Sequence, residues 1–180
     1  MMKKVLIIST SLRKDSNSEF LAKEFEKGAK EAGNEVEFIS LAGKTISFCT
    51  GCLACQKTQK CVIKDDAVEI AEKVKEANVL VFATPIYYYE MSGQMKTLLD
   101  RCNPLFPSKY AFREVYLLTT AADGDESAMD GAVKGMQGWM DCFNKARLAG
   151  VVRGVGIGDG GEAKNHTNLL AKVYTLGKKV

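Results

Sequence analysis

Residues 5–18 read VLIISTSLRKDSNS, and this stretch decides the fold. Val5 to Ser9 begins with an apolar run without polar alternation, which is typical of a central parallel strand covered by helices on both faces. The hydroxyl-rich loop after it ends at Ser16 or Asn17, either of which can cap a helix running to about Ala32. A strand, a loop and a helix in this order indicate an α/β fold.

The rest of the chain repeats this alternation of strand and helix. Further strands are predicted at 35–40, 79–83, 114–119 and 151–157, and further helices at about 65–77, 92–102, 126–147 and 164–178. Right-handed crossovers between parallel strands leave few topologies. We expect a single domain over residues 1–180: a doubly wound, five-stranded parallel sheet in the order 2-1-3-4-5 with helices on both faces. Such sheets bind ligands where the strand order reverses, at the carboxyl ends of the first and third strands.

Composition excludes several classes of function. The 180 residues carry 25 Lys and Arg against 22 Asp and Glu, and the net charge of +3 is spread along the chain. This balance gives no support to nucleic-acid or membrane-surface binding. No stretch approaches the ~18 apolar residues of a membrane span. The apolar run after Lys4 is only four residues, whereas a secretion signal needs ~7 to 15. We therefore expect a cytoplasmic protein without nucleic-acid or membrane partners.

The loop after the first strand has the chemistry of a phosphate site. Its free backbone N–H groups lie at the start of a helix, whose dipole favours an anion. The loop contains neither G-x-G-x-x-G nor the P-loop pattern, so its hydroxyls fit a terminal monophosphate better than a dinucleotide or a nucleoside triphosphate. The alternative interpretation is an ordinary helix cap with a solvated loop. The candidate donors are Ser9, Ser11, Arg13, Ser16, Asn17 and Ser18.

A second loop follows the predicted third strand. Pro85 stiffens its turn, and the backbone amides after it can point at the edge of a planar heterocycle, on which neighbouring aromatic rings can stack. The alternative is that Tyr87, Tyr88 and Tyr89 only complete the packing of the strand. Because successive side chains of a strand point to opposite faces, that alternative leaves some aromatic surface unexplained.

These segments carry a family resemblance. KKVLIISTSLRK (3–14), TPIYY (84–88) and QMKTLLDR (94–101) together resemble the NADPH-dependent FMN reductase family of flavodoxin-like proteins. The resemblance implies that the first loop holds the FMN phosphate and that Pro85, Ile86, Tyr87 and Tyr88 meet the isoalloxazine edge. It also implies a third loop beside the ring, with Thr120, Ala121, Asp123 and Gly124. Family members usually have Gly-Ser-Pro-Arg where this chain has STSLR (9–13), so the individual phosphate ligands differ from the usual pattern.

Four of the six cysteines crowd into one loop, which we expect beside the flavin edge. Cys49, Cys52, Cys55 and Cys61 are separated by two, two and five residues, and such spacing can surround one [4Fe-4S] cluster. It resembles the spacing of iron–sulfur flavoproteins, a branch of the same class that passes electrons between cluster and FMN. However, residues 48–57 also resemble FMN reductases that need no cluster. The same four cysteines also fit a closed zinc site or a set of free or redox-active thiols.

The resemblance implies an FMN-dependent NAD(P)H oxidoreductase that reduces a small acceptor, such as a quinone, a nitro or azo compound, a flavin or a metal ion. The flavin carries such chemistry, so no catalytic side chain is expected. The resemblance also implies a homodimer or higher homo-oligomer. One alternative is an iron–sulfur flavoprotein that carries electrons between protein partners, although flavodoxins of that kind are usually strongly acidic. Another is a binding module without flavin.

Overall fold

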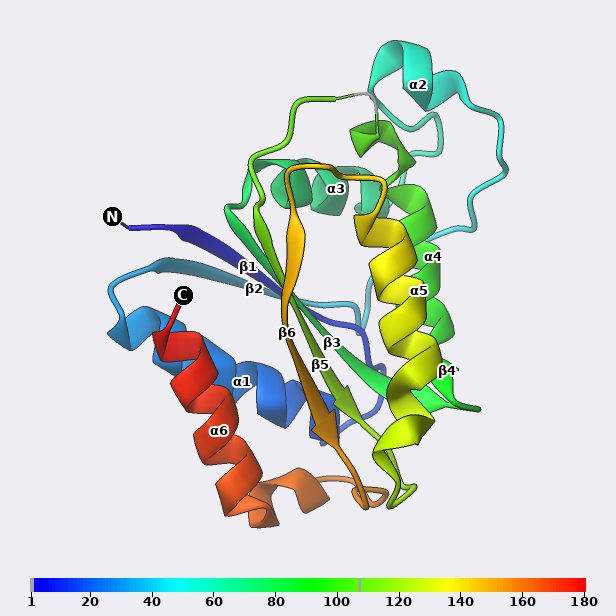
Figure 1. Ribbon diagram of the computed structural model, residues 1–180. Coiled ribbons are helices and arrows are strands. Elements are labelled where there is room, and N and C mark those ends of the chain that lie inside the picture. The colour runs from blue at the N-terminus through cyan, green and yellow to red at the C-terminus, as the bar shows by residue number, and fades with distance from the viewer. Residues whose placement is uncertain (1, 107) are drawn as a thin grey trace.

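The structure is a computed structural model that describes residues 2–106 and 108–180 (Figure 1). Its parallel strands are β1 (Lys4–Ser9), β2 (Glu35–Ser40), β3 (Val79–Tyr87), β5 (Glu114–Thr120) and β6 (Arg147–Gly154). They lie in the order β2-β1-β3-β5-β6, which confirms the predicted order of the five parallel strands. A short strand, β4 (Glu90–Met91), pairs antiparallel with the end of β3.

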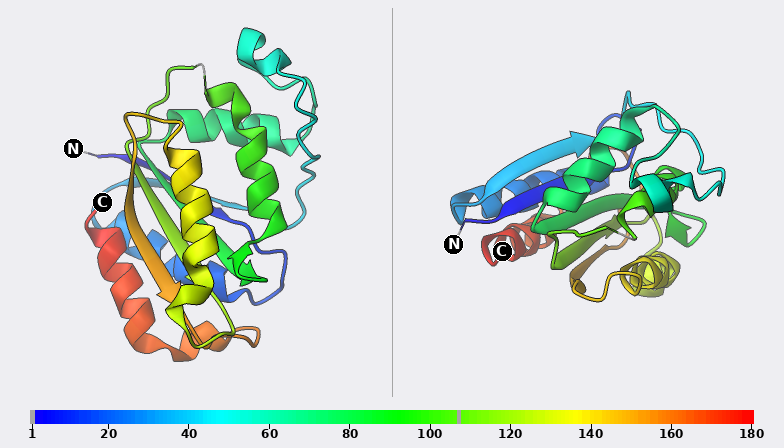
Figure 2. Two further views of the ribbon diagram at one scale, coloured as in Figure 1. Left: turned by 45° about the vertical axis from the view of Figure 1, so that its right-hand side comes forward. Right: turned by 90° about the horizontal axis from the view of Figure 1, so that it is seen from above.

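Helices lie on both sides of this sheet (Figure 2), as predicted. One face packs against α1 (Asn17–Glu31) and α6 (Thr167–Lys178), and the other against α3 (Asp66–Glu76), α4 (Gly93–Arg101) and α5 (Asp130–Met140). Shorter elements are α2 (Ala54–Thr58), η1 (Asn103–Leu105), η2 (Glu126–Met129) and η3 (Glu162–Asn165).

The two faces of the sheet build two separate cores. Val5 and Ile7 of β1 pack toward α1 and α6, whereas Leu6 and Ile8 pack toward α3, α4 and α5. This alternation follows from the two-residue period of a strand. Because both faces are covered, β1 is buried from Val5 to Ser9, which explains the unbroken apolar run in the sequence.

The predicted helix over 126–147 is wrong in its length. Residues 126–129 form a 3-10 turn capped by Asp125, α5 ends at Met140, and two turns then lead into β6. The fifth parallel strand occupies 147–154 instead of 151–157, because β6 pairs with the whole of β5, from Glu114 to Thr120. The last helix begins at Thr167 instead of residue 164, after the 3-10 turn η3.

Two glycines allow α1 and α6 to touch backbone to backbone. A Cβ atom at Gly28 would overlap the carbonyl oxygen of Tyr174, and one at Gly177 would overlap that of Phe25. Any larger residue at either position would force the helices apart. None of the described helices is both long enough and apolar enough to cross a membrane.

Candidate flavin site and cysteine loop

The loop after β1, the end of β3, and the end of β5 with the loop after it converge at the carboxyl edge of the sheet, where the strand order reverses. They enclose a cavity of about 170 Å³, which the loop after β6 completes. The cavity brings together nine of the residues predicted from the sequence: Ser11, Arg13, Ser16, Asn17, Pro85, Ile86, Tyr87, Thr120 and Ala121. Ala122, within the third loop predicted beside the ring, lines it as well. Ile157 and Gly158 also line it and were missed, although the glycine-rich run 154–161 was a signal that this loop can approach closely.

The first loop presents hydroxyls at the positive end of a long helix. Ser16 is the N-cap of α1, and its hydroxyl accepts a hydrogen bond from the backbone N–H of Glu19 at 3.3 Å. The Ser16 and Ser18 hydroxyls lie 3.1 Å apart, and the Ser11 hydroxyl accepts from the backbone N–H of Arg13. Because α1 is 15 residues long, its N-terminus carries most of the partial positive charge of a helix dipole.

Two predicted phosphate donors lie behind this loop instead of lining the cavity. Ser9 and Ser18 are fully buried, and the Ser9 hydroxyl donates to the carboxylate of Glu19 at 3.0 Å. Their role as phosphate ligands stays a prediction, whereas their observed hydrogen bonds hold the loop against the start of α1.

Asn17 ties the first loop to the loop after β6. Its Nδ2 donates to the carbonyl oxygen of Asp159 at 2.7 Å, and its Oδ1 accepts from the backbone N–H of Ala163 at 3.0 Å. Arg13 adds a 2.8 Å hydrogen bond from Nη1 to the carbonyl oxygen of Gly158. The carboxylate of Glu162 accepts from the N–H groups of Asp159 and Gly158, which lowers its pKa. The amide of Asn17 therefore orders the cavity wall.

The second loop is a tight hairpin with two tyrosines in the left-handed region. Tyr88 and Tyr89 have φ angles of 48° and 64°, the signs that a two-residue type I′ turn requires, although glycine or asparagine usually fills such positions. Tyr88 is completely exposed, at 100%. The Tyr89 hydroxyl donates to the carboxylate of Asp123 at 3.3 Å. This bond joins the second loop to the third, where Asp123 and Gly124 are exposed beside the cavity without lining it.

Three buried hydroxyl groups that were not predicted as site residues form a hydrogen-bonded cluster next to the hairpin. Ser92 is the N-cap of α4, and its hydroxyl accepts a hydrogen bond from the backbone N–H of Met95. The Ser92 and Thr10 hydroxyls lie 3.1 Å apart and share a hydrogen bond. Thr84 donates to the same Ser92 oxygen at 3.2 Å. All three side chains are buried, so the ends of β1 and β3 and the start of α4 form one rigid unit.

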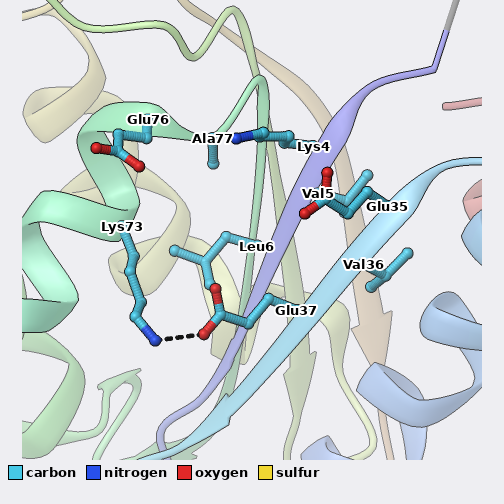
Figure 3. A pocket seen from close by; sticks show the side chains of 9 residues that line it. All are labelled: Lys4, Val5, Leu6, Glu35, Val36, Glu37, Lys73, Glu76 and Ala77. Atoms are coloured by element: carbon cyan, nitrogen blue, oxygen red, sulfur yellow. Dashed lines mark hydrogen bonds and ion pairs between the residues drawn. The ribbon is translucent and has the colours of Figure 1, made fainter.

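Another hollow, beside β1, β2 and α3, lies away from this edge (Figure 3). It is lined near the amino ends of the strands by residues such as Lys4 and Glu35, and Lys73 of α3 forms an ion pair there with Glu37. Its volume is about 120 Å³. Because parallel sheets bind ligands at their carboxyl ends, these charges are best explained as a solvated surface.

The cysteine loop lies at the opposite end of α4 from the cavity, so its predicted place beside the flavin edge is wrong. After β2, residues 41–48 run along α4 from Gly93 to Asp100, which places Cys49 beside Leu99 and Cys102. Figure 1 shows α2, within this loop, at the end of the molecule opposite to the arrowheads of β5 and β6. From Gly93 to Arg101, α4 rises about 12 Å at 1.5 Å per residue.

The four cysteines occupy different environments. Cys49 and Cys52 are exposed, Cys61 is half-buried, and Cys55 is buried with its sulfur 3.3 Å from the donor Nδ2 of Asn103. Hydrogen bonds from the backbone of Ala54 and the hydroxyl of Thr50 lower the pKa of Cys52. Across residues 2–106 and 108–180, no three Cys, His, Asp or Glu side chains are gathered closely enough to hold a metal ion. The donor chemistry fits a thiophilic metal, but the arrangement of the sulfurs does not.

The fold and the cavity define a class: a flavodoxin-like α/β protein with a cavity at the switch point of the sheet. A family model described as NADPH-dependent FMN reductase matches residues 3–158. The chain belongs to this family.

Curated relatives are named for an additional group. The chain is 43% identical over 102 residues to an iron–sulfur flavoprotein of Methanocaldococcus jannaschii, a match that covers 57% of this chain and 53% of the relative. It is 29% identical over 138 residues to an iron–sulfur flavoprotein of Methanosarcina thermophila, covering 76% and 72%. The chain spans about half the length of the first of these relatives.

Solved structures agree with the fold. An NAD(P)H:quinone oxidoreductase from Methanothermobacter marburgensis superposes with a TM-score of 0.73 at 18% identity, covering 99% of this chain and 96% of the other. An azoreductase from Bacillus anthracis superposes with a TM-score of 0.75 at 18% identity, covering 99% and 100%. At this identity the likeness concerns the fold alone.

Proposed function

We propose that this protein is an FMN-dependent oxidoreductase that takes electrons from NAD(P)H and passes them to a small acceptor. The observation that carries the proposal is the cavity at the switch point, where three loops chosen from the sequence for different parts of FMN meet. The family match supports the flavin. The names of the structural neighbours, a quinone oxidoreductase and an azoreductase, make quinones and azo compounds the first acceptors to test.

The residues of the first loop fit the phosphate of FMN. Ser11 and Ser16 supply hydroxyls, Arg13 supplies a positive charge, and the start of α1 supplies N–H groups. Asn17 would act mainly by holding the glycine-rich loop in place, since its amide is occupied by that loop.

The second and third loops fit the ring. Pro85, Ile86 and Tyr87 would border its edge from β3, and Thr120 and Ala121 from β5. Bound FMN would supply the two-electron chemistry, so the protein needs only to bind and orient it. Backbone N–H groups at this edge would stabilise negative charge on the reduced ring.

Flavin binding and reduction test the proposal. The protein is expected to bind FMN, and rapid mixing with NADH and with NADPH should bleach the flavin with at least one of them. Ser16→Ala should weaken FMN binding by removing a cap and a phosphate donor, whereas Ser127→Ala on the exposed turn η2 should not. A protein that takes up no FMN, or whose flavin neither nucleotide reduces, would contradict the proposal.

A second candidate function is that of an iron–sulfur flavoprotein. The names of the relatives and the spacing of the cysteines favour it. Cys49, Cys52, Cys55 and Cys61 would hold the cluster, and because their sulfurs lie apart in this conformation, the loop would have to close around the metal. Anaerobic reconstitution with iron and sulfide, followed by iron and sulfide analysis, tests this: about four irons per chain are expected for a [4Fe-4S] cluster, and none would exclude it.

A further inference from the structure

A groove separate from the cavity runs along one side of α4. It has a volume of about 600 Å³ and lies between α4 and residues 41–48. Its near end is at the carboxyl edge of the sheet, because Leu12, which lines it, belongs to the first loop, whose neighbouring residues line the cavity. From Gly93 to Asp100, α4 rises about 10 Å at 1.5 Å per residue. The groove therefore leads from the candidate flavin site toward the cysteine loop.

The groove has an apolar lining and an aromatic side chain at its far end. Leu41 is buried and Ile46 is half-buried in its wall. Phe48 also lines the groove, and it precedes Cys49, which lies beside Leu99 near the end of α4. The Phe48 side chain is 79% exposed, so most of its ring has no protein contact. An exposed ring in such a position is a surface on which a planar base can stack.

The charges of the groove favour an anion. Lys44 and Lys96 line it together with one acidic residue, Asp100. Lys44 pairs with Asp66 at 3.1 Å and Lys96 with Asp100 at 2.7 Å, and both ion pairs are open to solvent. Such exposed pairs contribute little stability, so a bound phosphate can replace either carboxylate. The wall opposite α4 is positive as a whole, because residues 41–64 contain four lysines and no acidic residue.

The far end of the groove is held in a fixed shape. Arg101, the last residue of α4, has a fully buried side chain and forms a two-pronged ion pair with Asp65, with N···O distances of 2.7 and 2.8 Å. The carbonyl oxygen of Ser47 accepts from Nη1 of Arg101, and the N–H of Ser47 donates to the carboxylate of Asp65. The backbone next to Phe48 is therefore ordered before a ligand binds, which lowers the entropic cost of binding.

We propose that this groove binds the ADP group of NAD(P)H, with the adenine on Phe48 and the pyrophosphate at Lys44 and Lys96, while the nicotinamide reaches the flavin cavity. The identity of the dinucleotide rests on the oxidoreductase function proposed above. An elongated groove with an exposed ring at one end and cations along its length matches a planar base joined to a pyrophosphate. An apolar electron acceptor would leave both lysines without a role.

ADP is a suitable probe, because its binding needs no turnover. The protein, incubated with FMN, is titrated with ADP and with pyrophosphate by isothermal titration calorimetry. Phe48→Ala removes the ring, and Lys96→Gln removes one positive charge. Val62→Ala and Lys60→Gln are the matched controls, since both residues are exposed in the same segment and neither lines the groove. Thermal unfolding shows whether each variant is folded.

The wild type and both controls are expected to bind ADP equally well, and to bind it more tightly than pyrophosphate. Phe48→Ala should weaken ADP binding at least about fivefold through the loss of stacking and leave pyrophosphate binding unchanged. Lys96→Gln should weaken the binding of both ligands and reduce its dependence on salt. In steady-state assays, Phe48→Ala should raise the KM for the nicotinamide nucleotide at least about fivefold without changing kcat, because the adenine is bound equally in the ground and transition states.

The outcomes separate the groove from the oxidoreductase function. Absence of ADP binding to the wild type, or equal ADP affinity in the wild type and Phe48→Ala, would overturn the ADP site. Equal affinity of the wild type for ADP and pyrophosphate would also overturn it, since the groove would then be a general anion-binding surface. So would a Phe48→Ala variant whose KM rises for a quinone with a decyl chain but not for the nucleotide. Because the ADP titration does not involve electron transfer, failure of flavin reduction would count against the oxidoreductase alone.

Discussion

The carbonyl oxygen of Tyr89 rests against the backbone of Gly131, so that a Cβ atom on that glycine would lie 2.5 Å from the oxygen. The β3–β4 hairpin, with its left-handed tyrosines, is pressed onto the first turn of α5 at this point. Gly135, one turn further on, leaves room for the side chains of Met91 and Glu90. Gly131 and Gly135 of α5 therefore leave the space that the hairpin occupies.

Substitution of Gly131 by alanine should displace the hairpin. We expect Gly131→Ala to destabilise the fold by about 1–3 kcal/mol through overpacking and to weaken FMN binding at least threefold. Gly138→Ala is the matched control, since it lies in the same helix with no atom within 4 Å of its Cβ position. It should stabilise the protein by about 0.5–1 kcal/mol. Thermal unfolding and flavin titration measure both effects; equal behaviour of the two variants would contradict the contact.

Loss of the Asn17 amide should loosen the cavity wall. Asn17→Ala removes the hydrogen bonds to Asp159 and Ala163 and should destabilise the protein by about 1–3 kcal/mol, because the backbone N–H of the buried Ala163 loses its partner. Hydrogen exchange across residues 157–163 should accelerate, and FMN should bind more weakly. Asn168→Ala, at an exposed position of α6, provides the comparison. Unchanged exchange in the Asn17 variant would show that the loop holds its shape without this residue.

Acid should release the ion pair of Asp65. Burial alone would raise the pKa of Asp65, but hydrogen bonds from Arg101 and Ser47 hold it below its ordinary value of 3.8. The folded carboxyl therefore loses its proton more readily than the unfolded one, so its contribution to stability is complete above pH 3.8 and is lost as the pH falls below it.

The variant Asp65→Asn isolates this contribution. At pH 7 it should cost up to about 3–5 kcal/mol, because Arg101 is left as an unpaired buried charge. The difference in free energy of unfolding between wild type and variant should shrink as the pH falls from about 4 toward about 2. Urea unfolding over this range measures it, and Asp141→Asn, at an exposed position after α5, shows the background. A difference in the free energy of unfolding that stays constant with pH would argue against the ion pair between Asp65 and Arg101.

The two cysteines outside the loop should differ in reactivity. Burial raises the pKa of Cys102 to about 12, whereas Cys142 is exposed. Since the thiolate is the nucleophile, iodoacetamide at about pH 8 should alkylate Cys102 at least about a hundredfold more slowly than Cys142 in the native protein. Mass spectrometry of tryptic peptides gives both rates, and urea should remove the difference. Rapid native alkylation of Cys102 would mean that the end of α4 opens readily.

Much of the fold could be predicted because its signals are local. The apolar runs of β1 and β3 and the caps at Ser16, Asp65 and Ser92 mark where parallel strands and helices begin. The end of α5 and the start of β6 were misplaced because residues 141–150 contain no proline and their one glycine lies at the end. Only pairing with β5, a contact distant in sequence, sets the bounds of β6.

The candidate site was predictable to a similar degree. The carboxyl ends of neighbouring parallel strands lie at one edge of the sheet, so the cavity residues from 11–17 and 85–87 could be predicted from the sequence. The wall from Ile157 and Gly158 was missed, because the glycine-rich run indicates only that a loop can approach closely, and its place at the cavity depends on the hydrogen bonds of Asn17 and Arg13 to this distant loop. The place of the cysteines was missed for the same reason: Arg101 draws both ends of their loop to the far end of α4.

The helix α4 thus separates two sets of residues that share no side chain: the cavity at its start and the cysteines at its end. A chain built in this way can gain or lose one function without rebuilding the other. Replacing all four loop cysteines would leave every residue that lines the cavity in place, and substitutions in the cavity would leave the cysteine loop unchanged. The same scaffold therefore carries a cavity near one end of α4 and a cysteine loop near the other, and the residues of each can change without a change in the other.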